Sequence, residues 1–147
     1  MRKLCLSAIL CLSACVMFAQ KSNNDTDTTT FKGYFLNKEY NVYLKINFYK
    51  SNITVPFQKI YGELPGYFGD CQDGRKWLFT SAEIVNNNKA DIEIINDYGS
   101  EDLTATLTKL NDSTFVLRQE NGSNIKIARN RKWVKMPKEL TFTKTKE

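Results

Sequence analysis

The stretch YNVYLKINFY, residues 40–49, alternates between two kinds of side chain without interruption. Every second residue from Tyr40 to Phe48 is large and apolar, and the residues between them are asparagine, lysine or tyrosine. Successive side chains of a β-strand point to opposite faces of the sheet, so this pattern predicts a strand with one buried face.

The same two-residue period recurs along the chain, and turn residues such as 86–88 (three asparagines) separate the segments. The further predicted strands are 31–36, 57–68 with a kink at Pro65-Gly66, 76–85, 89–95, 103–108, 115–119, 125–128 and 140–143. Strands with one apolar face bury it best by closing on themselves or by stacking as two sheets. We therefore predict an all-β fold, a small antiparallel meander barrel of eight or nine strands, with a β-sandwich as the alternative. Closure would pair the last strand with the first.

A hairpin is predicted at Asn121-Gly122, which lies between two alternating runs. A two-residue turn there would place Leu117 opposite Lys126. A three-residue loop over 120–122 instead pairs Phe115 with Ile127 and Leu117 with Ile125. Apolar matching favours the longer loop, with Gly122 in the left-handed position.

The first twenty residues have the features of an export signal. Residues 1–3 include two basic side chains, and residues 4–19 are almost entirely apolar but too few to span a membrane. Leu12-Ser13-Ala14-Cys15 matches the box in which a lipoprotein cysteine is acylated. The signal would then be 1–14 with a lipid on Cys15; with ordinary cleavage after Ala19 it would be 1–19.

Beyond the signal, residues 20–30 have no large apolar side chain and predict a flexible tether, followed by one barrel domain over 31–147. Under either cleavage, Cys71 is the sole thiol of the mature chain, so packing and not an intrachain disulfide holds the fold.

Without residues 1–19 the net charge is +3 (21 − 2 − 16). It is uneven, because 61–125 has 5 basic and 11 acidic residues and 126–147 has 8 and 2. A tail packed beside the middle would cancel this asymmetry.

The composition excludes several kinds of chemistry. The chain has no histidine, which removes Ser-His-Asp and Cys-His catalysis, and its single mature thiol cannot form a thiolate metal site. Asp91 and Glu93 share one strand face, and Asp97, Glu101 and Asp102 cluster in a segment whose spacing matches no standard calcium loop. We expect a protein that is not an enzyme and needs no cofactor or metal.

Two groups of side chains are candidates for binding. The aromatic group could line a barrel mouth and stack on sugars or hydrophobic ligands, with core packing as the alternative. It consists of Tyr43, Tyr49, Tyr61, Tyr67, Phe68 and Trp77. The basic group, in ARNRKWVK at 128–135, would suit a lipid head group, an acidic glycan or a partner protein, with a charged strand edge as the alternative. It consists of Arg129, Arg131, Lys132 and Trp133. Export argues against nucleic acid as a partner.

The segments GYF, EYNVYLKINFY and IYGELPGYF, with the ending STFVLRQENGSNIKIARNRKWVKMPKELTF, resemble a loose group of uncharacterised small exported β-rich proteins of Gram-negative bacteria. In outline the chain is also similar to lipocalin- and avidin-like barrels, although Gly33-Tyr34-Phe35 stands where lipocalins have Gly-x-Trp. The resemblance implies a periplasmic protein, or a lipoprotein anchored to the outer membrane through Cys15 alone.

The function expected from these features is a non-catalytic binding module of the cell envelope, for a small molecule or glycan. The alternative is an accessory protein or inhibitor that acts through an envelope protein.

Overall fold

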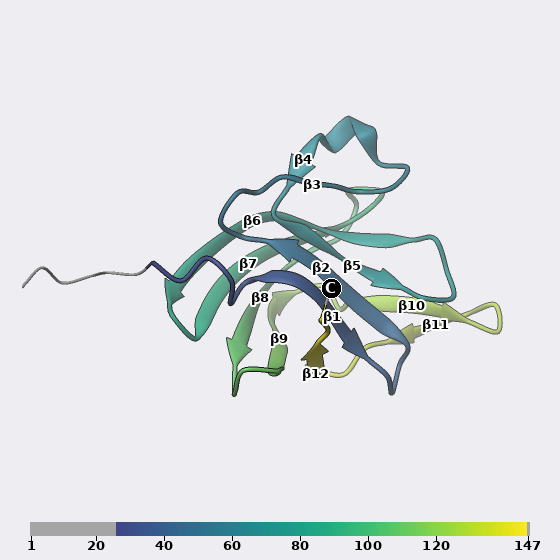
Figure 1. Ribbon diagram of the computed structural model, residues 1–147. Helices are drawn as coiled ribbons and strands as arrows, with labels where there is room; N and C mark the ends of the chain where they lie inside the picture. Colours follow the sequence, from purple (N-terminus) through teal and green to yellow (C-terminus); the bar gives the residue numbers. More distant parts are fainter. Residues whose placement is uncertain (1–25, 147) are drawn as a thin grey trace, which may run out of the picture.

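Eight antiparallel strands close into a barrel in the computed structural model, which describes residues 26–146 (Figure 1). In order around the barrel they are β1 (Lys32–Asn37), β12 (Glu139–Lys144), β9 (Thr114–Gly122), β8 (Asp102–Lys109), β7 (Lys89–Asn96), β6 (Lys76–Asn86), β5 (Gly66–Asp70) and β2 (Val42–Asn47). The predicted all-β barrel is thereby confirmed over the sandwich. The predicted closure is also confirmed, because β1 pairs with β12 and Leu36 lies opposite Thr143.

Two ribbons interrupt an otherwise simple meander. β3 (Ile53–Thr54) pairs with β4 (Glu63–Leu64), and the 3₁₀ helix η1 (Lys59–Tyr61) lies between them. β10 (Lys126–Arg129) pairs with β11 (Lys132–Lys135). The strands that flank each ribbon still pair directly, β2 with β5 and β9 with β12, so the barrel is closed without either ribbon.

Bulky side chains fill the barrel interior. An eight-stranded barrel is just wide enough for inward side chains to meet at its axis. Phe35 and Phe115 meet edge to face with ring centroids 4.8 Å apart, and Phe68 meets Phe142 in the same way at 6.5 Å. The largest interior side chains with less than 2% exposure include Phe31, Phe35, Phe68, Phe79, Phe115, Phe142, Leu44, Ile46, Ile92, Ile94 and Leu107.

A second apolar cluster lies on the outer face of the barrel, under the β3–β4 ribbon. Val55 and Leu64 of the ribbon segment are buried against Tyr67 of β5 and Leu78 of β6. Tyr43 of β2 joins this cluster, and its ring is edge-on to that of Tyr67 with centroids 5.9 Å apart. The ribbon therefore explains why a tyrosine, Tyr43, occupies the otherwise polar face of β2.

The strand predicted over 57–68 is wrong for its first half. Gln58 N–H donates to the Val55 carbonyl (3.2 Å) across a turn at Pro56-Phe57, and η1 follows. The chain becomes extended again at β4, after Gly62 with its φ of +65°. Proline and a left-handed glycine thus replace a long strand by a short ribbon.

The hairpin predicted at Asn121-Gly122 is also wrong. β9 continues to Gly122 and pairs with β8 and β12, and β10 pairs with β11 instead. Phe115 accordingly lies opposite Phe142 and not opposite Ile127.

The buried side chain of Gln119 takes the place of that hairpin's backbone pairing. Its amide oxygen accepts from Ile125 N–H (2.7 Å) and its amide nitrogen donates to the Pro137 carbonyl (2.9 Å), so one side chain holds both ends of the β10–β11 ribbon. Gly122, with a φ of +103°, is needed because a Cβ there would lie 2.5 Å from the Asp102 carbonyl oxygen. The glycine serves a close approach of two strands and not a turn.

The end of the predicted tether is ordered against the barrel. Asp27 accepts hydrogen bonds from the backbone and hydroxyl groups of Thr29 and Thr30, and these bonds lower the pKa of its carboxyl well below the ordinary value. Thr30 is buried, so the domain begins before residue 31. The export signal and Cys15 lie outside the described residues. Within residues 26–146, no helix is long and apolar enough to cross a membrane.

Candidate ligand-binding site

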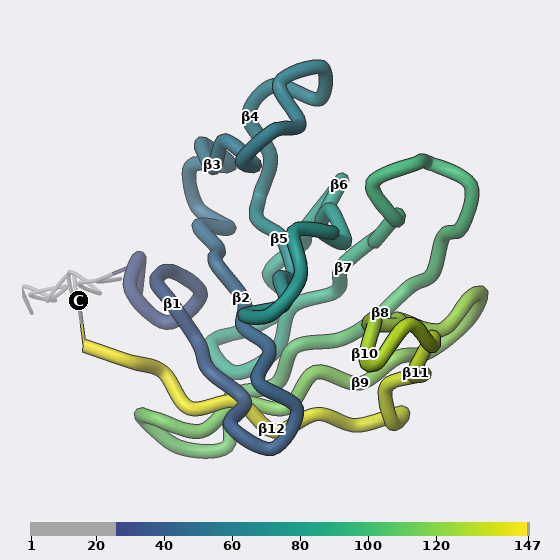
Figure 2. The backbone as a smooth tube through the Cα atoms, turned by 90° about the vertical axis from the view of Figure 1, so that its right-hand side faces the viewer, coloured from purple at the N-terminus to yellow at the C-terminus, as the bar shows by residue number. Residues whose placement is uncertain are grey.

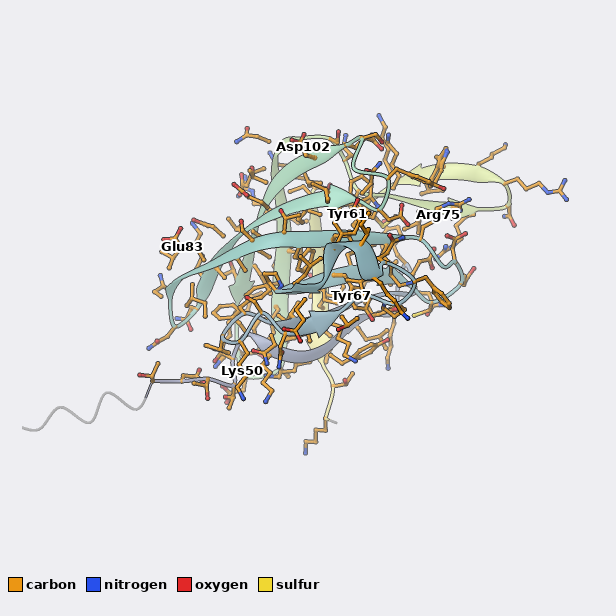
Figure 3. The ribbon with its side chains drawn as sticks, turned by 90° about the horizontal axis from the view of Figure 1, so that it is seen from above. Lys50, Tyr61, Tyr67, Arg75, Glu83 and Asp102 are labelled. Carbon is orange, nitrogen blue, oxygen red and sulfur yellow. The ribbon has the colours of Figure 1, made fainter. Side chains whose placement is uncertain are left out.

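The β10–β11 ribbon packs against one end of the barrel, which faces the viewer in Figure 2. A pocket of about 230 Å³ opens at this end. Three segments surround it: the start of β6, the loop between β7 and β8, and the ribbon itself. Figure 3 shows Arg75 at this end of the molecule and Glu83, further along β6, at the opposite end. The pocket is lined by Arg75, Lys76, Trp77, Asn96, Asp97, Tyr98, Ser100, Glu101, Lys126 and Trp133.

Trp77 joins the pocket to the barrel core. Its side chain is 6% exposed and belongs to the interior cluster, while its indole N–H donates to the Lys126 carbonyl (3.1 Å). This bond fixes the base of β10 against β6. The ribbon is further held by Ile125, Ile127 and Met136, which are buried in the same cluster. The wall formed by the ribbon is therefore part of the folded core.

Asn96 organises the loop that forms the opposite wall. Its side-chain oxygen accepts from the N–H groups of Ser100 (2.9 Å) and Glu101 (3.2 Å), and its amide nitrogen donates to the Ser100 hydroxyl (2.9 Å). The loop closes through Gly99, whose φ is +70°. These bonds order the loop while Tyr98 projects from it with 77% of its surface exposed.

An ion pair joins the two walls. Lys126 Nζ of the ribbon lies 2.7 Å from Glu101 Oε1 of the β7–β8 loop, and both side chains are about one-third exposed. Asp97 also faces the start of β6, where its carboxylate accepts from Lys76 N–H (3.2 Å). The pocket therefore offers hydrogen-bonding groups whose positions are already fixed, which lowers the entropy lost when a ligand binds.

Trp133 provides an exposed aromatic surface beside the pocket. Its side chain is 60% exposed, and the guanidinium of Arg75 lies 5.0 Å from its ring centroid. Arg75 is in turn 2.7 Å from the Asp73 carboxylate. The contact between the guanidinium and the indole stabilises one orientation of the Trp133 ring. The ring is therefore a preformed surface on which a ligand can stack.

Arg129, a predicted binding residue, is engaged within the fold. It forms a two-point ion pair with Asp70 of β5, with distances of 2.5 and 2.9 Å, and also donates to the carbonyls of Ala128 and Tyr40 at 2.8 Å. The Asp70 side chain is only 4% exposed, and its hydrogen bonds raise the pKa of Arg129 above the ordinary value. Arg129 therefore attaches the ribbon to the barrel.

Arg131 and Lys132 remain at the surface, at the turn of the ribbon. Asn130 and Arg131 have φ values of +51° and +61°, the left-handed pair of a two-residue hairpin turn. A groove of about 460 Å³ lies beside this turn and shares Arg75 and Trp133 with the pocket. It is lined by Gln72, Asp73, Arg75, Ala128, Arg129, Asn130, Arg131, Lys132 and Trp133.

The predicted aromatic group is divided by the fold. Trp77 is in the pocket, Phe68 is buried in the barrel interior, and Tyr43 and Tyr67 lie under the β3–β4 ribbon, where burial raises their pKa values. Tyr61 also packs in the cluster under that ribbon, and its hydroxyl donates to the Asp97 carbonyl (3.4 Å). The Tyr49 hydroxyl accepts from Phe31 N–H (3.1 Å) at the far end.

Sequence reasoning placed Arg131, Lys132, Trp133 and Trp77 in two separate groups, and the structure brings them to one end. It missed Arg75, Asn96, Tyr98, Glu101 and Lys126. The segment NDYGSED carried a signal, because an asparagine that ends a strand and a glycine three residues later indicate a tight polar loop. Its partner across the pocket could not be found without the course of the ribbon.

The carboxylates considered for catalysis line a groove on the outer face of the sheet, together with Glu83 and Glu120. Asp91 and Glu93 are exposed on the outer face of β7, where Asp91 lies 3.9 Å from Lys89 Nζ and Glu93 accepts from the Ser81 hydroxyl (3.0 Å). Among residues 26–146, no three carboxylate, histidine or cysteine side chains are grouped so that they could hold a metal ion. Cys71 is exposed.

The geometry at the ribbon end suits reversible binding of a small polar ligand with a flat face: two exposed aromatic rings, prearranged polar groups and an adjoining basic groove. Comparisons with models of known protein families, with curated proteins and with solved structures found no match.

Proposed function

We propose that this protein is an exported, non-catalytic binding module of the bacterial cell envelope, and that it holds an acidic glycan at the ribbon end of the barrel. The observation that carries the proposal is the pair of exposed aromatic side chains, Tyr98 and Trp133, on opposite walls of one pocket whose polar groups are already hydrogen-bonded in place.

Sugar recognition fits this combination of groups. The faces of sugar rings carry apolar C–H groups that pack on aromatic rings, and their hydroxyls need donors and acceptors at the ring edge. Glu101 supplies acceptors and Lys126 supplies donors beside the aromatic side chains, and both side chains are about one-third exposed. The volume of about 230 Å³ fits a single sugar ring and is small for a larger apolar ligand.

The adjoining groove favours a ligand that also has negative charge. Arg131 and Lys132 are exposed there, whereas Arg129 is already neutralised by Asp70. A glycan with a ring in the pocket could place the carboxylate of a neighbouring sugar beside these two side chains. A uronic-acid oligosaccharide has this chemistry.

Calorimetric titration of the processed chain with matched neutral and uronic-acid oligosaccharides tests the proposal. We expect Trp133→Ala and Tyr98→Ala each to weaken binding about tenfold, because each removes one stacking surface. Arg131→Ala with Lys132→Ala should weaken binding of the acidic oligosaccharide more than that of the neutral one, and added salt should reduce the difference.

Leu110→Ala is the matched control, since Leu110 is an exposed apolar residue beyond β8 at the other end of the barrel. It should leave every affinity unchanged. The proposal is overturned if no oligosaccharide tested gives a heat of binding. It is also overturned if Leu110→Ala and Trp133→Ala weaken binding equally.

A second candidate function, docking of an acidic envelope protein, is favoured by the same exposed ribbon turn. Asn130 and Arg131 hold the turn in a left-handed conformation that projects Arg131 and Lys132 from the surface. In this case a protein partner recovered from envelope extracts should be lost with Arg131→Ala and Lys132→Ala, and retained with Tyr98→Ala.

A further inference from the structure

The tip of the β3–β4 ribbon presents two apolar side chains to solvent. Phe57 is 97% exposed and Ile60 is 89% exposed, the highest values for large apolar residues in the described chain. The ribbon with η1 at its tip stands off from the barrel in Figure 1. Packing within the fold does not explain why these two positions are apolar, because both side chains remain in contact with water.

The local backbone conformation works against Phe57. Pro56 precedes Phe57, and the φ of Phe57 is +64°. Gln58 N–H donates to the Val55 carbonyl (3.2 Å), so residues 55–58 have the pattern of a type II turn. The third position of this turn favours glycine, since a residue with a Cβ is strained at positive φ. An aromatic residue there costs stability and gains no packing within the chain.

The base of the ribbon, in contrast, is firmly attached. Val55 and Leu64 are buried on the outer face of the barrel, and the Tyr61 hydroxyl donates to the Asp97 carbonyl. The ribbon therefore has apolar residues of two kinds. One set anchors it to the barrel, and the other set, Phe57 and Ile60, points away from it.

Part of the backbone of the tip is hydrogen-bonded within the tip itself. The N–H groups of Gln58, Tyr61 and Gly62 donate to carbonyls within the tip, and Pro56 has no N–H. Internal pairing lowers the cost of removing a backbone from water. The stretch from Lys50 to Gly62 contains no acidic residue.

We propose that this tip inserts Phe57 and Ile60 into the acyl boundary of a lipid bilayer. Two side chains offer an area on the order of 400 Å², about half of what each partner of a stable protein interface buries. They also form a convex tip, which a bilayer accommodates without a matching cavity. Lys59, exposed between them, would meet anionic head groups. This proposal is independent of the pocket.

Depth-dependent fluorescence quenching tests the insertion. The chain is expressed with its own leader, purified as the host processes it, and combined with vesicles of phosphatidylethanolamine and phosphatidylglycerol, with or without brominated acyl chains. Phe57→Trp introduces an indole at the tip, and Leu110→Trp introduces a matched one at an exposed position remote from the ribbon. The emission of the parent chain is subtracted from both.

We expect bromine to quench the indole introduced by Phe57→Trp and to leave that of Leu110→Trp as bright as in unbrominated vesicles. Adding Ile60→Ser to Phe57→Trp should reduce the quenching. The proposal is overturned if Phe57→Trp is not quenched or if both indoles are quenched equally. Quenching does not involve the pocket, so this result and the glycan titration fail or succeed separately.

Discussion

Replacing Arg129 by methionine should destabilise the whole domain, although sequence reasoning placed this arginine among surface binding residues. The substitution leaves the Asp70 carboxylate, 4% exposed, without its cation, and leaves the Tyr40 carbonyl without its donor. Removing one partner of a buried ion pair costs about 3–5 kcal/mol. Because Arg129 itself is 21% exposed, we expect the lower limit, about 3 kcal/mol. For a domain of about 120 residues this is about 12 °C in melting temperature.

Urea and thermal unfolding followed by tryptophan fluorescence measure this loss directly, since Trp77 is hydrogen-bonded to the same ribbon. Arg131→Met is the matched control: it makes the same chemical change two residues away at an exposed position and should cost less than about 0.5 kcal/mol. Asp70→Asn combined with Arg129→Met should recover part of the loss, because no buried charge is left unpaired. Equal effects of Arg129→Met and Arg131→Met would refute the assignment of Arg129 as the attachment of the ribbon.

Three further predictions test the packing. Gly66→Ala should cost about 1–3 kcal/mol in urea unfolding because the new Cβ would overlap the Lys45 carbonyl oxygen, whereas Gly74→Ala, with nothing within 4 Å, should be neutral. Burial raises the pKa of Tyr43 above its ordinary 10.0, so its contribution to stability is complete below pH 10 and is lost as the pH rises further. Tyr43→Phe should therefore flatten the decline of the unfolding free energy above pH 10, and parallel curves would contradict this. Phe57→Gly should leave the melting temperature unchanged or raise it, because glycine relieves the positive φ; a drop of several degrees would show that Phe57 supports the fold.

The barrel itself could be predicted because its signal is local and repeated. Ala90, Ile92 and Ile94 alternate with polar residues and are all buried, as the two-residue period requires. Closure followed from the number of strands with one apolar face. Most strand pairs, such as β6 with β7 and β7 with β8, join consecutive strands across a short loop, so the local sequence indicates which strands are neighbours.

The two ribbons could not be predicted because long-range contacts determine them. Asn121-Gly122 has the local signature of a hairpin, yet the side chain of Gln119 bonds both ends of the ribbon and β8 approaches Gly122 too closely for any other residue. Local turn preference is here overridden by a buried polar side chain. The two-residue period places Gln119 on the inward face with Phe115 and Leu117, but it does not indicate which distant backbone groups the amide bonds.

The sequence indicated which types of side chain form the candidate site, but not which individual residues come together there. Aromatic and basic side chains were recognised as candidates. Whether each one is buried or exposed depends on which outer face of the barrel a ribbon covers. Under the β3–β4 ribbon Tyr67 is buried and Tyr43 is partly buried, while Trp133 of β11 is exposed. The Lys126–Glu101 pair joins residues 25 apart in the chain, and its existence follows from the ribbon's course alone.

The two ribbons on which both proposals rest are not required for closure of the barrel. Strands β2 and β5, and β9 and β12, pair directly, so the closed sheet does not need the ribbons in order to close. Its interior is occupied by side chains such as Phe35 and Phe115, and the candidate pocket lies at one end of the barrel. The β10–β11 ribbon forms one wall of this pocket, and the β3–β4 ribbon projects an apolar tip from one side. Substitutions at the tips of the ribbons should therefore change binding while leaving stability intact, whereas substitutions at their bases should do the reverse.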